Sequence, residues 1–395
     1  MTYSEFLFPN DLHIVWSLMI VTYPYITGLV AGAFIASSLY HLFGREELAP
    51  VSRFSLLVSL SFLLCATLPL LFHLGHPERA LNVMITPHWH SAIAGFGFIY
   101  TFYLIVLILE ILVSYREDNI RAFNASSGGI SRKFWGALTL GVLRVDAETK
   151  EADRKTIRTL TLIGVPAACT LHGYVGFLFG SLKSNPWWST PLMPQVFLLS
   201  AIMSGLALVI LLYLFLGQRN TLDPDPECLK SLNFFLWLAL VGYVVSEGLE
   251  LLFFFYESSD AWFVISTLLL TRLWNSFVLL QLGIGVVVSF ILLSILLFKR
   301  PVGTLYKYLT ILASATILFE VWMMRWNIVV GGQQFSKSYV GFRGYTPEWF
   351  DKEGIVTAIF LTLLPLAILF ALTRFFSPKP AEEINIEPEQ PETIT

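Results

Sequence analysis

The sequence predicts an all-helical integral membrane protein of about nine transmembrane helices, packed as two bundles with the N-terminus outside. Of its 395 residues, 55% are hydrophobic and 13% are charged, and the mean hydropathy is +0.68. So little charge does not fit a soluble domain. The apolar residues also come in long blocks, and about 20 residues suffice to cross a bilayer as a helix. Because backbone polar groups cannot stay unpaired in lipid, we expect each block to be helical.

Nine apolar blocks are long enough to span a bilayer. The region 261–298 is also long enough to hide a break near Arg272, which would move the C-terminus to the other side but leave the first four helices in place. The nine blocks fall near residues 12–42, 52–74, 91–115, 157–181, 194–217, 231–257, 274–298, 304–327 and 354–376.

The orientation follows from the Lys and Arg residues of the connectors, which collect on the cytoplasmic side of membrane proteins. With the N-terminus outside, the inner connectors hold 18 of the 25 Lys and Arg residues and the outer connectors hold 7. The connector 116–158 supplies half of the inner number, so the prediction depends strongly on this one segment.

This orientation divides the chain into five parts. The Pro- and Glu-rich tail has few apolar residues, so we expect it to be disordered. The parts are 1–115 with three helices and an outer lid at 71–90, the cytoplasmic loop 116–156, 157–257 with helices four to six, 258–376 with helices seven to nine and the outer loop 325–353, and the cytoplasmic tail 377–395.

The outer lid, LFHLGHPERALNVMITPHWH, holds four of the seven histidines: His73, His76, His88 and His90. Without acidic partners or cysteines this pattern is a weak metal signal, and we predict no metal site. The chain has no CxxC or CxxCH, so we expect no iron–sulfur cluster and no c-type haem of its own. The net charge of −3 gives no sign of nucleic-acid binding.

Two polar pairs lie near the predicted outer membrane surface. Asn10 and His13 are three residues apart and share a helix face, where they could reach a ligand. Alternatively, Asn10 or Asp11 caps the helix and His13 is simply hydrated. His172 and Tyr174 lie among glycines that permit close helix packing or leave room for a flat ring. A buried Tyr hydroxyl needs a partner, and a quinone carbonyl is one possibility.

Carboxyl groups lie within the predicted spans of the second half. Glu247 and Glu250 are three residues apart on one face, and Glu320 precedes Arg325 in the eighth block. Ionisable groups in membrane helices are costly and mark functional sites, so these four residues are candidates for a proton path. The alternative is that Glu247 or Glu250 pairs with a hydroxyl or with Arg272 and only fixes the packing.

Three segments, in the same order and spacing, resemble the polysulfide-reductase (NrfD-like) membrane subunit family, in particular its longer members. LGHPERALNV resembles the family's LGxPxRxxN connector, and RWNIVVGGQ resembles its RxNxxxGGQ element. The segment GYVGFLFGSLKSNPWWSTPLMPQVFLLSAIMSGLAL resembles the pattern YTGxLL…PxW…PxxFxxSAxxxGxAL, with YVG in place of YTG.

The resemblance implies a quinone-interacting anchor subunit in the cytoplasmic membrane of a prokaryote. Such subunits hold a four-cluster iron–sulfur protein, often with a molybdopterin catalytic subunit or multihaem cytochromes, and carry no redox cofactor themselves. Menaquinone or ubiquinone would bind near the face that meets the partner. Asn10, His13 and Tyr174 match the family's pocket in kind and spacing.

The resemblance also gives the outer lid a role beside the quinone headgroup. His172 and His76 would border the site, and His76 would relay protons, since its ordinary pKa suits that exchange. Arg79 would contact the quinone or an acidic patch of the partner, unless it only reaches to the interface.

Three other classes remain open. A haem-b quinol dehydrogenase subunit needs facing histidines at one depth, which the sequence does not offer. A transporter needs broken helices and repeats, and no repeat is visible. A purely structural anchor would have no quinone site.

Overall fold

The computed structural model describes residues 14–219, 224–257, 260–335 and 342–379. Within them, nine helical stretches are long and apolar enough to cross a membrane, which confirms the predicted all-helical membrane fold. The stretches are α1 (Leu18–His41), η2–α2–α3 (Glu46–Leu48, Ala49–Ala66, Leu68–His73), α5 (Ala94–Ser114), α8 (Ala147–Gly180), α9 (Met193–Gln218), α10 (Pro226–Glu257), η4–α12–η5 (Trp274–Val288, Ser289–Ser294, Ile295–Lys299), α13 (Gly303–Val329) and α14 (Ile355–Phe375).

Short helices occupy the connectors between the spans. The outer lid holds η3 (Pro77–Arg79) and α4 (Asn82–Ile85), and the long inner loop holds α6 (Arg116–Ala125) and α7 (Gly129–Leu138). The turn η6 (Gly331–Gln333) follows α13.

The structure refines two predicted boundaries. α8 begins at Ala147, ten residues before the predicted block, because the Asp146 carboxylate caps it by accepting from Thr149 N at 2.7 Å. α11 (Asp260–Thr271) ends just before η4 begins at Trp274, so the suspected break near Arg272 exists. α11 is too short to span, so the number of spans stays at nine.

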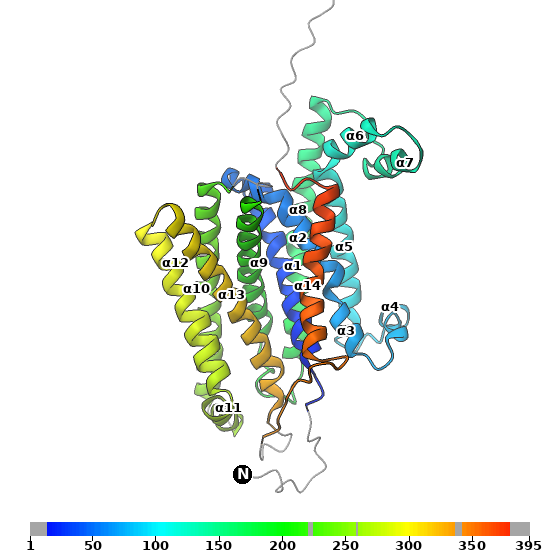
Figure 1. Ribbon diagram of the computed structural model, residues 1–395. Coiled ribbons are helices and arrows are strands. Elements are labelled where there is room, and N and C mark those ends of the chain that lie inside the picture. Colours follow the sequence, from blue (N-terminus) through cyan, green and yellow to red (C-terminus); the bar gives the residue numbers. More distant parts are fainter. Residues whose placement is uncertain (1–13, 220–223, 258–259, 336–341, 380–395) are drawn as a thin grey trace, which may run out of the picture.

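The two ends of the described chain lie on opposite faces (Figure 1). We call the face where α1 begins the outer face and the face where α1 ends the inner face. α3, α4 and α11 lie at the outer face, whereas α6 and α7 lie at the inner face (Figure 1). The predicted tail 377–395 lies mostly outside the described residues, which end at Lys379.

The centre of the molecule is the crossing of α1 with α8 and α9. A Cβ added to Gly32 of α1 would lie 2.7 Å from Gly205 Cα of α9. A Cβ on Gly176 of α8 would lie 2.7 Å from Pro194 Cα at the start of α9. Small residues at both crossings let the backbones approach closely, which is how membrane helices gain packing energy without a hydrophobic driving force.

The remaining helices gather on the two sides of this centre. α2, α5, α8 and α14 lie on one side, and α10, α12 and α13 lie on the other (Figure 1). α9 packs against both α1 and α10. The two predicted bundles are therefore joined along α1 and α9.

Candidate functional site

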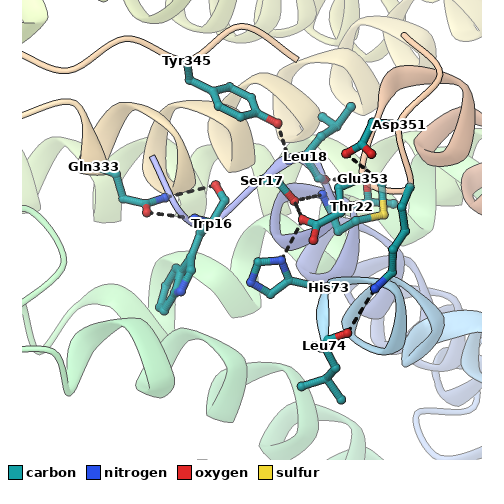
Figure 2. Close-up of polar contacts among 12 residues, drawn as sticks. Trp16, Ser17, Leu18, Thr22, His73, Leu74, Gln333, Tyr345, Asp351 and Glu353 are labelled. Carbon is teal, nitrogen blue, oxygen red and sulfur yellow. Dashed lines mark hydrogen bonds and ion pairs between the residues drawn. The ribbon is translucent and has the colours of Figure 1, made fainter. Parts of the chain in front are cut away.

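The first residues of α1 are held by the connector between α13 and α14. Trp16 N donates to Gln333 Oε1 at 3.2 Å, and Gln333 Nε2 donates back to Trp16 O at 3.3 Å. Leu18 N donates to the Tyr345 hydroxyl at 2.9 Å (Figure 2). Burial raises the pKa of Tyr345, so this acceptor stays a neutral phenol at physiological pH. Gln333 ends the RWNIVVGGQ segment, so this motif positions the residues just beyond His13.

A titratable pair lies beside this contact. Glu353 Oε2 accepts from the Ser17 hydroxyl and lies 2.8 Å from His73 Nδ1 (Figure 2). The two side chains are 25% and 21% exposed, so both reach water. Ser17 Oγ also accepts from Met19 N at 3.3 Å and caps α1. The outer end of α1 thus carries a carboxyl group and an imidazole that contact each other and are both partly exposed to solvent.

Aromatic stacking joins the start of α1 to the outer end of α8. The Trp16 ring stacks on Trp188 at 5.0 Å between centroids and meets Phe179 of α8 edge-on at 5.7 Å. Trp188 Nε1 donates to Ile328 O at 2.7 Å. The start of α1, the connector between α8 and α9 that carries Trp188, and the end of α13 near residue 330 therefore pack together at the outer face. A cavity of about 130 Å³ opens beside it, and its lining includes Trp16, Asn185, Gln333 and Arg343.

The structure separates two predicted ligand residues, His172 and Tyr174. The Tyr174 hydroxyl donates to Ala92 O at 2.5 Å, at the outer end of α5. Gly95 makes room for it, since a Cβ there would lie 2.5 Å from the hydroxyl. His172 points instead to the interior, where its Nε2 lies 3.0 Å from Arg325 Nη2. The two side chains therefore serve different parts of the protein.

Arg325 lies at the centre of a fully buried polar cluster. Its Nη2 donates to Ser200 Oγ at 2.6 Å, and its guanidinium lies 3.9 Å from the Phe197 ring centroid. An arginine can only donate, so His172 Nε2 must accept and the imidazole is neutral. In the described part of the chain no carboxylate lies within ion-pair distance of Arg325. The cluster therefore stabilises a buried cation by neutral acceptors and an aromatic face.

A second buried cluster joins α10, η4 and α13 through Gln281. Gln281 Nε2 donates to Glu247 Oε1 at 2.7 Å and lies 3.3 Å from the Tyr243 hydroxyl. Asn327 Nδ2 donates to Gln281 Oε1 at 2.8 Å. The sequence interpretation missed Gln281, although an amide in the middle of an apolar block was the available signal. Asn327 belongs to the RWNIVVGGQ motif but was given no role.

Glu320 lies between the two clusters. It is fully buried, and neither of its carboxyl oxygens has a hydrogen-bond partner among the described residues. The charged groups that act on it are Glu247 and Arg325. Gly285 of η4 packs against it, since a Cβ on that glycine would lie 2.6 Å from Glu320 Cβ. The Tyr243 hydroxyl also acts on this carboxyl, and a buried carboxyl of this kind is a candidate functional group.

Glu250 is buried on the same face of α10 as Glu247, and its Oε1 has no partner in the described residues. The alternative in which Arg272 pairs with one of these carboxyls does not occur here, since Glu247 bonds Gln281 and Arg272 is exposed.

Two of the predicted ligand residues lie apart from this geometry. His76 and Arg79 lie at the exposed tip of the outer lid, where both interact with Glu78, at 3.0 Å and 3.9 Å. Asn10 and His13 lie outside the described residues. Among the described residues no three His, Cys, Asp or Glu side chains are grouped to hold a metal ion.

The fold and the site define a multi-pass helical membrane protein with ionisable side chains in its interior and at its outer face. Residues 9–337 match the profile of the polysulphide reductase NrfD family, so the chain belongs to that family, and the resemblance of the three motifs is confirmed.

Several named proteins are similar over most of their length. A selenate reductase subunit of Mesobacillus selenatarsenatis is 26% identical, over 94% of this chain and 91% of the relative. The Hdr-like menaquinol oxidoreductase integral membrane subunit of Archaeoglobus fulgidus is 21% identical, over 90% and 85%. A polysulfide reductase polypeptide of Wolinella succinogenes is 22% identical, over 60% and 70%. All three relatives are named as parts of reductases or of an oxidoreductase.

Proposed function

We propose that this protein is the quinone-interacting membrane subunit of a respiratory oxidoreductase complex. It exchanges electrons between the membrane quinone pool and an iron–sulfur partner subunit at its outer face, together with movement of protons. Asn10, His13 and Tyr174 bind the quinone ring. Menaquinone is the favoured quinone, because one relative of nearly full length is named a menaquinol oxidoreductase subunit; ubiquinone is the alternative.

The observation that carries this proposal is the contact between Trp16 and Phe179 at the outer face. Phe179 lies five residues beyond Tyr174 on α8, and Trp16 lies three residues beyond His13. This contact brings the start of α1 to the outer end of α8, which supports a site to which both segments contribute, although Tyr174 lies on a different face of α8 from Phe179. The Tyr174 hydroxyl bonds a backbone carbonyl here, which a quinone oxygen could replace as acceptor.

Titratable groups next to this region suit quinone chemistry, which exchanges two protons with each two electrons. The His73–Glu353 pair is close to water at the start of α1. The clusters around Arg325 and Gln281 extend the polar groups into the membrane interior, where Glu247, Glu250 and Glu320 provide acceptors for a proton path. His76 and Arg79 lie at the exposed tip of the lid, which supports a contact with the partner beside the quinone site.

The outer connectors offer the surface for the partner. We assign it a four-cluster iron–sulfur protein, with a molybdopterin catalytic subunit or a multihaem cytochrome beyond it, in the cytoplasmic membrane of a prokaryote. Asn185 Nδ2 donates to Gly332 O at 2.8 Å, and this hydrogen bond supports a fixed arrangement of two of these connectors. A preformed surface of this kind loses little entropy when a partner docks.

The test is quinol-driven electron transfer in the assembled complex, measured for Tyr174→Phe and His13→Ala. We expect each variant to lose about 10-fold or more in kcat/KM for the quinol, since one hydrogen bond in a desolvated site contributes about 1.5 kcal/mol. Tyr100→Phe is the matched control, because its hydroxyl also donates to a carbonyl, Leu63 O at 2.8 Å. Unchanged transfer in both site variants would leave a structural anchor as the better description.

A further inference from the structure

A large cavity lies at the inner face, far from the outer site. Its volume is about 800 Å³, and it lies among the inner ends of α1, α2 and α5 and the first turns of α8. α8 extends beyond the bundle at the inner face (Figure 1). Residues of its first turns, from Lys150 to Arg158, line the cavity. The polar lining includes His41, Arg53, Ser114, Lys150, Arg154 and Arg158.

The lining carries unpaired positive charge. Arg154 and Arg158 are one helical turn apart on α8 and exposed, and neither has an ion pair or hydrogen bond in the described residues. Other charges of the lining are neutralised: Lys150 lies 3.5 Å from Glu117, and Asp153 pairs with Arg116.

Glu46 is the one exposed carboxylate of the lining for which the described residues provide no ion pair. The unpaired charge is thus two guanidinium groups against one carboxylate, which favours an anion.

Buried donors of the lining lack partners. Arg53 is 7% exposed and pairs with Asp118, but its Nε has no hydrogen-bond partner in the described residues. The same holds for His41 Nε2 and Ser114 Oγ. Buried polar atoms are nearly always paired. Three unpaired donor-bearing atoms on lining residues agree with the preference of the two free guanidinium groups for an acceptor-rich ligand. Glu117 Oε2 is also unpaired, and a hydroxyl or ammonium group on the ligand would satisfy it.

We propose that this cavity binds a phosphate group, supplied by the headgroup of an anionic phospholipid in the inner leaflet. A guanidinium pair matches phosphate in a forked geometry, and basic pockets between membrane helices hold lipid headgroups. The position at the inner ends of three spanning helices is the depth of the headgroups. A soluble phosphate compound shares the same chemistry and is the other possible source.

The test compares two double variants of the full-length protein, purified with its partner subunits in detergent. Arg154→Gln with Arg158→Gln removes the unpaired charge of the cavity. Arg121→Gln with Arg144→Gln removes two exposed charges from the same inner region but outside the cavity. Each protein is delipidated and titrated with phosphatidylglycerol or phosphatidylcholine, and bound lipid is counted by native mass spectrometry.

We expect the cavity variant to bind phosphatidylglycerol at least about 10-fold more weakly than the wild type, as loss of one charge-assisted hydrogen bond would produce. The control variant should bind it as the wild type does, and phosphatidylcholine should bind weakly to all. Arg154→Lys with Arg158→Lys keeps the charge but loses the forked donor geometry, so its affinity should fall between those of the wild type and the Gln variant. If the Gln variant does not assemble, Ala49→Phe, which fills the cavity from α2, should give the same loss.

Inorganic phosphate distinguishes the sources. If millimolar inorganic phosphate displaces phosphatidylglycerol and stabilises the delipidated protein equally well, the site holds soluble phosphate rather than lipid, and the assignment to a lipid is overturned. Equal lipid binding by the cavity and control variants would overturn the phosphate site itself.

Discussion

The Nε2 atom of His172 lies 3.0 Å from Nη2 of Arg325, although the two residues are 153 positions apart in the sequence. The contact joins α8, which carries Tyr174 at the outer face, to α13, which carries Glu320. It therefore links the proposed quinone site to the proposed proton path. Both side chains are fully buried, and Arg325 also donates to Ser200 Oγ, so His172 is one of the few acceptors of a buried guanidinium.

This contact predicts that removing His172 and removing Arg325 lower the free energy of unfolding by different amounts. His172→Leu leaves a buried guanidinium with one acceptor fewer and should lower the free energy of unfolding by about 1.5–3 kcal/mol. His172→Gln keeps an acceptor and should cost less. Arg325→Met removes the buried charge itself and should also cost less than His172→Leu, because a lost charge needs no partner. Denaturant titration in mixed micelles measures all three, with exposed Arg272→Met as the control. A cost for Arg325→Met above that of His172→Leu would contradict this account.

A second prediction concerns proton movement through the interior. Glu320→Gln and Glu247→Gln keep the size and hydrogen-bonding capacity of the side chains but cannot carry a proton. Because a positioned acid–base group accelerates proton transfer by about 100-fold or more, we expect coupled proton uptake to fall by that order. The measurement is pH change in liposomes that contain the whole complex and are driven by quinol. Glu110→Gln is the control, since Glu110 is fully buried but accepts from Thr161 on the other side of the molecule. Equal loss in all three variants would point to a packing effect.

A third prediction tests the contacts that hold the start of α1. Gln333→Ala removes two hydrogen bonds to the backbone of Trp16, at 3.2 and 3.3 Å. Each such bond contributes about 0.5–1.5 kcal/mol, so the quinol KM should rise about 5-fold to 100-fold while assembly is retained. Lys352→Ala is the control. Lys352 lies in the same connector as Gln333, but its hydrogen bond goes to Leu74 O of the outer lid and not to α1. A KM that changes equally in both variants would show that the connector acts as a whole rather than through Gln333.

The spans could be predicted from the sequence because lipid leaves the backbone one solution: every apolar block had to be a helix. The partners of the buried polar groups could not be predicted in the same way. Arg325 was predicted at the end of the eighth block, but its partners His172 and Ser200 lie on α8 and α9, and no spacing in the sequence relates them to it. Gln281 is uncharged and did not interrupt its apolar block. The separation of His172 from Tyr174 was available in principle, since residues two apart on a helix do not share a face.

The last prediction concerns the crossing of α1 and α9, on which the position of every buried cluster depends. Gly32→Ala places a Cβ 2.7 Å from Gly205 Cα, and backbone atoms cannot move aside as the end of a flexible side chain would. The helices must separate, which should cost about 1–3 kcal/mol and shift Ser200 on α9 away from Arg325. Gly173→Ala is the matched control on α8, because nothing lies within 4 Å of the added Cβ and Ala favours the helix. Denaturant titration of the two variants should therefore show a loss of stability for the first and none for the second. Equal stability of Gly32→Ala and the wild type would mean that the two helices are not in close contact, and the buried clusters would need another explanation.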